Sequence, residues 1–401
     1  MFRLCLAITT LVLLAASGTA AANGEWSGYG GIELRVFPRS PAFPEQERST
    51  LSPSLELQPE IRLEWNDGND RITVIPFLRL DADDDQRTHG DLRELNWLHL
   101  ERSWDLRLGL GKVFWGVAES RHLIDIVNQT DLVEDVDAEE KLGQPMANLN
   151  LLSDWGTFGL FALPGFRERT FPDGRARLRG ILPIDTDEAA YESSREEARI
   201  DWAGRWSRVF GDWDIGLGHF RGTSREPRLV PAPKASGKIV LVPHYDIIGQ
   251  TSLDLQATKG SWLWKLEAMT RSGQGKRFGA LVGGFEYTLF GLRGSAVDLG
   301  LLGEYLYDGR DDEAPVTPWD DDLFLGLRLS PNDVQSSELL AGVLWDRDNG
   351  ALMLNLEASR RIGRHWIMEV EGRIFSDIPN GDPLAGLARD DFARFRLKRF
   401  F

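Results

Sequence analysis

The chain has 401 residues, of which 46 are basic and 62 acidic, and its formal net charge is −16. This excess of acid argues against nucleic acid as a partner, because phosphate binding needs a basic surface. Cys5 is the single cysteine, so a disulfide framework is excluded as well.

The first residues have the pattern of an export signal. Arg3 precedes an apolar run that begins at Leu4, and small residues follow, ending in Ala20-Ala21-Ala22. This order of a positive residue, an apolar run and an A-x-A site predicts a cleaved signal peptide over residues 1–22. We therefore expect one mature domain over residues 23–401.

Beyond residue 23 the recurring pattern is alternation of apolar and polar residues. In "SLELQPEIRLEW", Leu55, Leu57 and Ile61 fall on one face of an extended chain, and Glu56 and Glu60 fall on the other. A period of two predicts strands. Eighteen such segments occur, with sixteen as the alternative if the weak segments 147–153 and 322–330 are not strands. The expected strands are 25–38, 51–65, 71–82, 91–101, 104–115, 147–153, 155–164, 197–208, 211–222, 244–257, 261–271, 277–289, 296–308, 322–330, 337–345, 350–360, 364–376 and 390–401.

The connections between these strands alternate in length. Every second one is tight, as in "NDGN" at 66–69, whereas most others are long, as at 116–146 and 165–196. Six tryptophans lie next to the tight turns: Trp65, Trp104, Trp155, Trp213, Trp262 and Trp366. Short turns on one side, long loops on the other and an aromatic girdle are typical of a transmembrane antiparallel β-barrel. We expect an all-β barrel in the outer membrane of a Gram-negative bacterium, with short periplasmic turns, long extracellular loops and both termini periplasmic.

The polar face of the strands carries charges of both signs. The predicted pore-lining residues are Glu60, Arg62, Arg79, Glu369, Glu371, Arg373, Arg394, Arg396 and Lys398. One interpretation is a polar conduit whose acidic and basic walls orient solutes. The other is a ladder of salt bridges that braces the wall and transmits nothing.

The segment "GKVFWGVAESRHLIDIVNQTDLVEDVDAEEKLGQPMANL" (111–149) is the most distinctive in the chain. A connection of this length is usually functional or disordered. We predict a short helix over 118–127 and an external loop over 116–146 that folds into the lumen. The candidate constriction residues are Arg121, His122, Asp125, Asn128 and Asp131. The alternative is a loop that lies over the mouth or packs between protomers.

The run "WGVAESRHLIDIVNQTDL…EEKLGQPM" resembles a segment of porin-like outer-membrane proteins of Gram-negative bacteria. The layout of the whole chain is also loosely similar to eighteen-stranded substrate-specific porins and to alginate-export-type barrels. The resemblance implies passive or selective diffusion of small hydrophilic solutes, narrowed by the 116–146 loop. It also implies a homotrimer or a monomer in contact with outer-membrane lipid and lipopolysaccharide. The other hypotheses are a plugged barrel with a structural or partner-binding role and a barrel hydrolase.

Motifs for catalysis are missing from the sequence. There is no G-x-S-x-G, no H-E-x-x-H, no H-x-S and no phosphate loop, so we do not expect an enzyme or a cofactor. The acidic runs at 81–85, 134–140 and 308–322 are oxygen-rich, as calcium requires. None has the spacing of a calcium loop, and we expect solvated loops without a metal.

The chain ends "DDFARFRLKRFF", which again alternates. Phe395 and Phe401 fall on the lipid-facing set, and Arg394, Arg396 and Lys398 fall on the luminal set. An alternating strand that ends in phenylalanine resembles the signal recognised by the barrel-assembly machinery. We therefore expect Phe401 and Phe395 to serve assembly.

Overall fold

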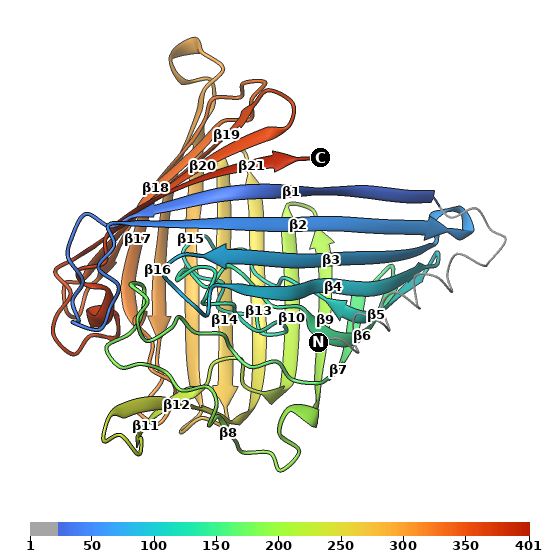
Figure 1. The fold of residues 1–401 in the computed structure, drawn as a ribbon. Coiled ribbons are helices and arrows are strands. Elements are labelled where there is room, and N and C mark those ends of the chain that lie inside the picture. The colour runs from blue at the N-terminus through green and yellow to red at the C-terminus, as the bar shows by residue number, and fades with distance from the viewer. Residues whose placement is uncertain (1–22) are drawn as a thin grey trace.

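A computed structural model describes residues 23–401, and the predicted signal peptide lies outside the described residues. Eighteen strands form a single antiparallel sheet that closes on itself, because β1 (Asn23–Val36) pairs with both β2 (Leu51–Trp65) and β21 (Phe392–Phe400). Figure 1 shows β21 beside β1 at this closure. The all-β barrel fold and the count of eighteen strands are therefore confirmed.

The other barrel strands follow in chain order. They are β3 (Asp70–Asp81), β4 (His89–Leu100), β5 (Trp104–Gly111), β6 (Gln144–Ser153), β7 (Gly156–Pro164), β9 (Ile200–Phe210), β10 (Trp213–Thr223), β13 (Ile247–Lys259), β14 (Trp262–Ser272), β15 (Phe278–Leu289), β16 (Asp298–Asp308), β17 (Asp321–Ser330), β18 (Glu338–Asp346), β19 (Leu352–Ile362) and β20 (Trp366–Ser376). Four short 3₁₀ helices lie in the connections: η1 (Asn66–Gly68), η2 (Glu196–Ala198), η3 (Leu292–Gly294) and η4 (Pro383–Leu387). No helix within residues 23–401 is long and apolar enough to cross a bilayer.

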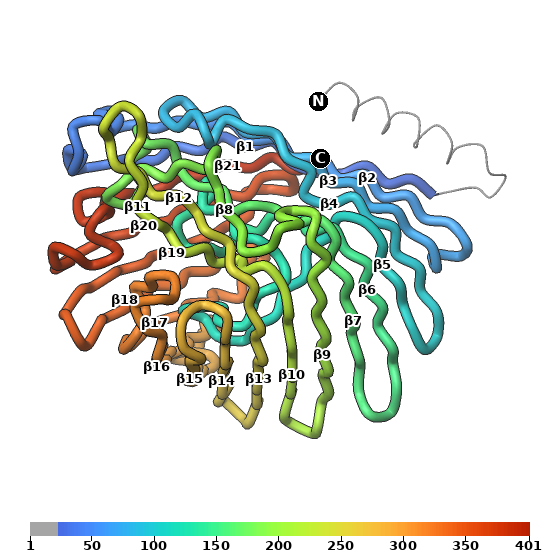
Figure 2. Tube along the Cα trace, turned by 90° about the horizontal axis from the view of Figure 1, so that it is seen from below, coloured from blue at the N-terminus to red at the C-terminus, as the bar shows by residue number. Residues whose placement is uncertain are grey.

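The two ends of the barrel differ. The turn end carries the tight connections and both ends of the described chain, and the six girdle tryptophans begin or end strands there or lie in its turns. The loop end carries the long connections, including a small sheet of β8 (Ala190–Tyr191), β11 (Arg228–Pro233) and β12 (Ile239–Tyr245). This sheet was not predicted; it lies toward the viewer in Figure 2.

The barrel wall has an apolar outer face and a polar inner face, which is the reverse of a soluble barrel. Along β2, Leu55 and Leu57 are exposed on the outside, whereas Ser54 and Glu56 are buried inside. Phe395 on β21 is likewise exposed. Backbone groups in a bilayer must pair within the protein, and a closed barrel with an apolar exterior meets that requirement.

The closure of the barrel depends on the last residues. The backbone N–H of Phe401 donates to the carbonyl of Gly28, 3.0 Å away, and the Phe401 ring stacks on Trp26 with 6.2 Å between the ring centroids. The ring of Phe400 packs on Tyr29 on the inner side, at 5.5 Å. The terminal residue thus lies on the outside of the β1–β21 seam.

We predict that deleting Phe401 lowers the yield of folded barrel in the outer membrane several-fold, because the seam loses an aromatic pair and a hydrogen bond. The measurement is the heat-modifiable fraction on unboiled gels, with Phe290→Ala, another exposed aromatic, as the control. An unchanged yield would contradict the predicted role. Unfolding of the Phe401 deletion after refolding into detergent separates assembly from stability. If the defect is one of assembly alone, the unfolding midpoint is the same as that of the unmodified protein.

Candidate functional site

Residues 112–143, which we call the infolded loop, join β5 to β6 and pass through the interior of the barrel. The backbone N–H groups of Val117 and Ala118 donate to Oε1 of Glu267 on the distant strand β14, at 2.6 and 2.9 Å. Gly116 permits this approach, because a Cβ there would lie 3.0 Å from the same oxygen. The loop is therefore anchored across the lumen from its own strands.

The helix predicted over 118–127 is wrong. The amides of Glu119 and Ser120 donate to the two carboxylate oxygens of Glu304 on β16, both at 2.8 Å. Further along, the amide of Ile124 donates to Oε2 of Glu267 at 3.1 Å, in place of the Ser120 carbonyl that a helix would require. Carboxylates of the wall thus take the place of helical carbonyl groups.

The first half of the infolded loop is apolar and packs against an apolar part of the inner wall. Ile124 and Val127 are completely buried in this cluster. The wall side is formed by Val282, Leu302, Leu306, Phe324 and Leu344 of β15 to β18. Burial of side chains of this size stabilises the docked loop by about 1.5–3 kcal/mol each.

The second half is acidic and docks on arginines of the opposite wall, β3, β4, β20 and β21. The contacts are Asp131 with Arg93 at 2.6 Å, Glu134 with Arg79 at 2.7 Å, Asp135 with Arg394, and Asp137 with Arg373 at 2.7 Å. Removing one partner of a fully buried pair, such as Asp131 with Arg93 or Glu134 with Arg79, costs about 3–5 kcal/mol, because the other charge stays buried and uncompensated. Asp137 differs, because it is partly exposed and its partner Arg373 also pairs with Glu371. The acids are not a solvated run.

The nine predicted pore-lining residues belong to the strands and are largely paired with neighbours. Arg396 contacts Glu33 at 2.7 Å, and Lys398 contacts Glu369 at 3.0 Å. Arg62 contacts Glu60 at 2.7 Å. Arg373 and Arg394 both contact Glu371. The geometry thus contains the predicted salt-bridge ladder, and a role of these residues in permeation stays a prediction.

The five candidate constriction residues divide into two groups. Arg121, His122 and Asp125 line a cavity. Asn128 is buried, accepts from the amide of Val113 at 2.8 Å and donates to the carbonyls of Gly111 and Leu142 at 2.9 and 2.8 Å.

Asp131 is also buried and binds Thr170 in the next long loop at 2.5 Å, in addition to Arg93. Asn128 and Asp131 thus fix the path of the infolded loop; neither is among the residues that line its two cavities.

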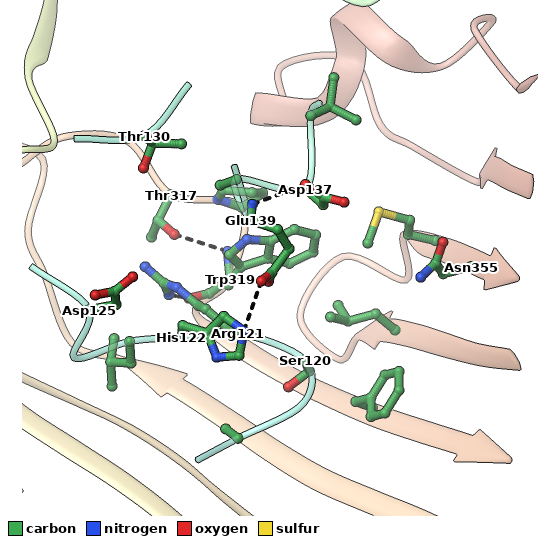
Figure 3. Close-up of a pocket in the computed structure, with 18 of the residues that line it drawn as sticks. Ser120, Arg121, His122, Asp125, Thr130, Asp137, Glu139, Thr317, Trp319 and Asn355 are labelled. Carbon is green, nitrogen blue, oxygen red and sulfur yellow. Dashed lines mark hydrogen bonds and ion pairs between the residues drawn. The ribbon is translucent and has the colours of Figure 1, made fainter. Parts of the chain in front are cut away.

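The infolded loop leaves two cavities in the lumen. The outer cavity, toward the loop end, measures about 550 Å³, and the inner cavity, toward the turn end, about 380 Å³. Figure 3 shows Arg121, His122, Glu139 and Trp319 gathered in the outer cavity. Both cavities are lined by Leu340 and by four acids that we call the acidic boundary: Glu119, Asp137, Glu139 and Glu357.

Two groups at or beside the acidic boundary have unusual proton affinities. Burial and the Asp135 carboxylate raise the pKa of Asp137 to about 7, against the opposing effect of Arg373. Burial disfavours charge on His122, but its contact with Glu139, at 3.0 Å, raises the pKa of the imidazole above its usual value. Asp137 therefore changes its charge near neutral pH, and His122 holds its proton more tightly than a free imidazole does.

Sequence reasoning did not single out Glu304 or Glu119. Glu304 has the signal shared by all inner-face residues, a polar side chain between apolar neighbours, but its partner lies far away in the chain.

Three other groups have the spacing of metal ligands, since ligand atoms of His89, Asp131 and Glu134 lie within 4.8 Å of one another. The arginines already bound to both acids argue against that use.

Comparisons with known proteins agree on the fold. No family model and no curated protein matches the chain. The structure of Wzi from Escherichia coli, titled a carbohydrate-binding β-barrel involved in group 1 capsule assembly, overlaps with a TM-score of 0.52 and 8% identity, covering 92% of this chain and 83% of that one. A mutant porin of Rhodopseudomonas blastica overlaps with a TM-score of 0.43 and 10% identity, covering 94% and 100%. The overlap with Wzi shows that the chain shares the β-barrel fold of that outer-membrane protein.

We predict that docking of the infolded loop weakens as the pH rises. A raised pKa means that the docked state binds the proton more tightly, so the contribution of Asp137 is full at low pH and is lost as the pH passes through about 7. Hydrogen exchange of the segment 129–142, corrected for intrinsic rates, should lose about tenfold protection between about pH 5 and about pH 8.

Asp137→Asn should keep its protection at the higher pH, because the amide resembles the protonated acid. Asp187→Asn, in another external loop, should behave as the unmodified protein. If Asp137→Asn and Asp187→Asn lose protection equally, Asp137 does not control docking.

Proposed function

We propose that the mature chain, residues 23–401, is an outer-membrane channel for small hydrophilic solutes. The observation that carries the proposal is the infolded loop, which narrows the lumen and leaves an outer and an inner cavity that share the acidic boundary. Support comes from the apolar exterior, from the tryptophans at the turn end and from the position of Asn23 and Phe401, the two ends of the described chain, at that same end. This arrangement suits a periplasmic turn end. Assembly by the barrel-assembly machinery and contact with lipopolysaccharide belong to this proposal, as a monomer or a homotrimer.

The second candidate is a barrel that binds partners or solutes without conducting. It is favoured by the pairing of the interior charges, since an acid and an arginine that neutralise each other do not attract an ion from solution. Wzi, the barrel with the better overlap, is titled carbohydrate-binding. Conductance separates the two candidates.

A hydrolase has the least support. Nδ1 of His219 lies 2.9 Å from Oγ1 of Thr251 on exposed positions of β10 and β13. Within residues 23–401, no carboxylate lies within the 4.0 Å of an ion pair from that imidazole. A nucleophile and base therefore lack the third group that would orient the base.

We predict that the refolded protein gives small, stable conductance steps in planar bilayers and that deleting residues 118–142 enlarges them several-fold. The deletion removes both docked halves of the infolded loop and joins two adjacent strands by a short connection, so the wall remains complete. Deletion of 229–244, which removes the β11–β12 hairpin at the loop end, is the control and should have a smaller effect. Absence of current from both the full chain and the 118–142 deletion would exclude the channel.

We also predict a preference for cations, set at the acidic boundary. Glu357 contacts Asn355 but forms no ion pair within residues 23–401, and Glu139 pairs only with His122. In a roughly tenfold KCl gradient, Glu139→Gln with Glu357→Gln should move the reversal potential toward that of an unselective pore. Glu188→Gln, outside both cavities, is the matched control. If the double variant and this control give the same reversal potential, the acidic boundary has no part in ion selectivity.

A further inference from the structure

Four arginines gather around one carboxylate, and three of them line the outer cavity. We call Arg121, Arg169, Arg271 and Arg310 the arginine cluster. They come from four separate parts of the chain: the infolded loop, the loop after β7, the end of β14 and the loop after β16. Glu226, in the loop after β10, is bound by Arg271 at 2.7 Å and by Arg310 at 2.9 Å.

The charge around Glu226 shows how strong this field is. Burial alone would raise the pKa of the Glu226 carboxyl, but Arg310, Arg271, Arg121 and Arg169 outweigh burial and hold that pKa well below its usual range. The positive charge of the cluster therefore exceeds what one carboxylate needs.

Among the residues that the structure describes, one further carboxylate pairs with the cluster. Asp308 binds Arg310 at 2.6 Å and Arg121 at a longer 3.4 Å. Among residues 23–401, no carboxylate lies within 4.0 Å of Arg169, whose guanidinium has only a long contact, 3.4 Å, with the amide oxygen of Gln129. Four positive charges thus face two negative ones, and Arg169 is the guanidinium with the greatest unused capacity.

These unused groups face open space. Arg121, Arg169, Arg271 and Glu226 all line the outer cavity, together with the ring of Trp319. At about 550 Å³, the cavity is of the size that binds small ligands. A guanidinium offers two parallel donors that match a carboxylate, and this match is strongest where water is partly excluded.

We infer that the outer cavity is a binding site for a small organic carboxylate, held by Arg169 and Arg121 beside Trp319. This goes beyond the proposed function and does not rest on conduction. Glu139 of the acidic boundary pairs with His122, next to Arg121, at 3.0 Å. This acid repels an anion, so the ligand is held with its carboxylate toward Arg169.

The experiment uses the refolded full-length mature barrel in a neutral detergent at low salt, because salt screens these contacts. Binding of sodium glucuronate is measured by calorimetry and by the fluorescence of tryptophan. Glucose has the same ring without the carboxylate, and glucosamine carries a positive charge instead. We expect saturable binding of glucuronate and at least tenfold weaker binding of the other two.

Two variants test the residues. Arg169→Gln should weaken glucuronate binding about tenfold or more. Arg175→Gln is the matched control, because Arg175 is in the same loop but is exposed and paired with Glu47 at 2.9 Å, outside the cavity. Glu226→Gln should tighten binding several-fold, since it removes a competing carboxylate and frees donors of Arg271 and Arg310.

Three results would overturn the inference: no saturable binding of glucuronate, equal binding of glucose, or equal effects of Arg169→Gln and Arg175→Gln. Weaker binding by Glu226→Gln would also oppose it, because it would make the cluster a structural brace that needs its acid. Binding without current would leave the site standing and remove the channel. Current without binding of glucuronate would leave the channel standing and remove the binding site.

Discussion

The pairing of loop acids with wall arginines is the interaction on which the interior of this barrel depends. Asp135 sits between Arg394 and Arg373, and Glu134 sits on Arg79. Each of these charges would be costly to bury alone, so neither the wall nor the loop is stable in this form without the other. This side of the barrel interior is therefore a single charged unit assembled from β3, β20 and β21 and from the second half of the infolded loop.

The two halves of the infolded loop are held by different forces. The first half is anchored by amide contacts with Glu267 and Glu304 and otherwise depends on apolar area removed from water, which changes little with pH. The acidic half depends on charges, which respond to both. A change in solution conditions can thus loosen the segment around Asp137 while Ile124 and Val127 stay packed. Two residues of the acidic boundary, Asp137 and Glu139, lie on the acidic half of the loop. Glu119 lies on the apolar half, and Glu357 belongs to the wall.

Much of the barrel could be predicted from the sequence because a strand is a local pattern. A period of two placed Arg394, Arg396 and Lys398 on one face and Phe395 on the other without knowledge of any partner. The path of the infolded loop could not be predicted in that way, since Asp137 and Arg373 are more than two hundred residues apart and meet only in a closed barrel. The expected helix over 118–127 failed for the same reason: the carboxylates that bind its amides belong to β14 and β16.

The distribution of charge also explains why residues of one type have different roles at different depths. Within the wall, arginines such as Arg396 are surrounded by glutamates of nearby strands, and such contacts stiffen the wall. Near the loop end, long loops bring arginines together without an equal number of acids, as around Glu226. Strand neighbours are fixed by register, so their charges can be balanced locally, whereas loop residues can leave an excess. The proposed binding site accordingly lies at the unbalanced group of arginines at the loop end and not along the charged ladder of the wall.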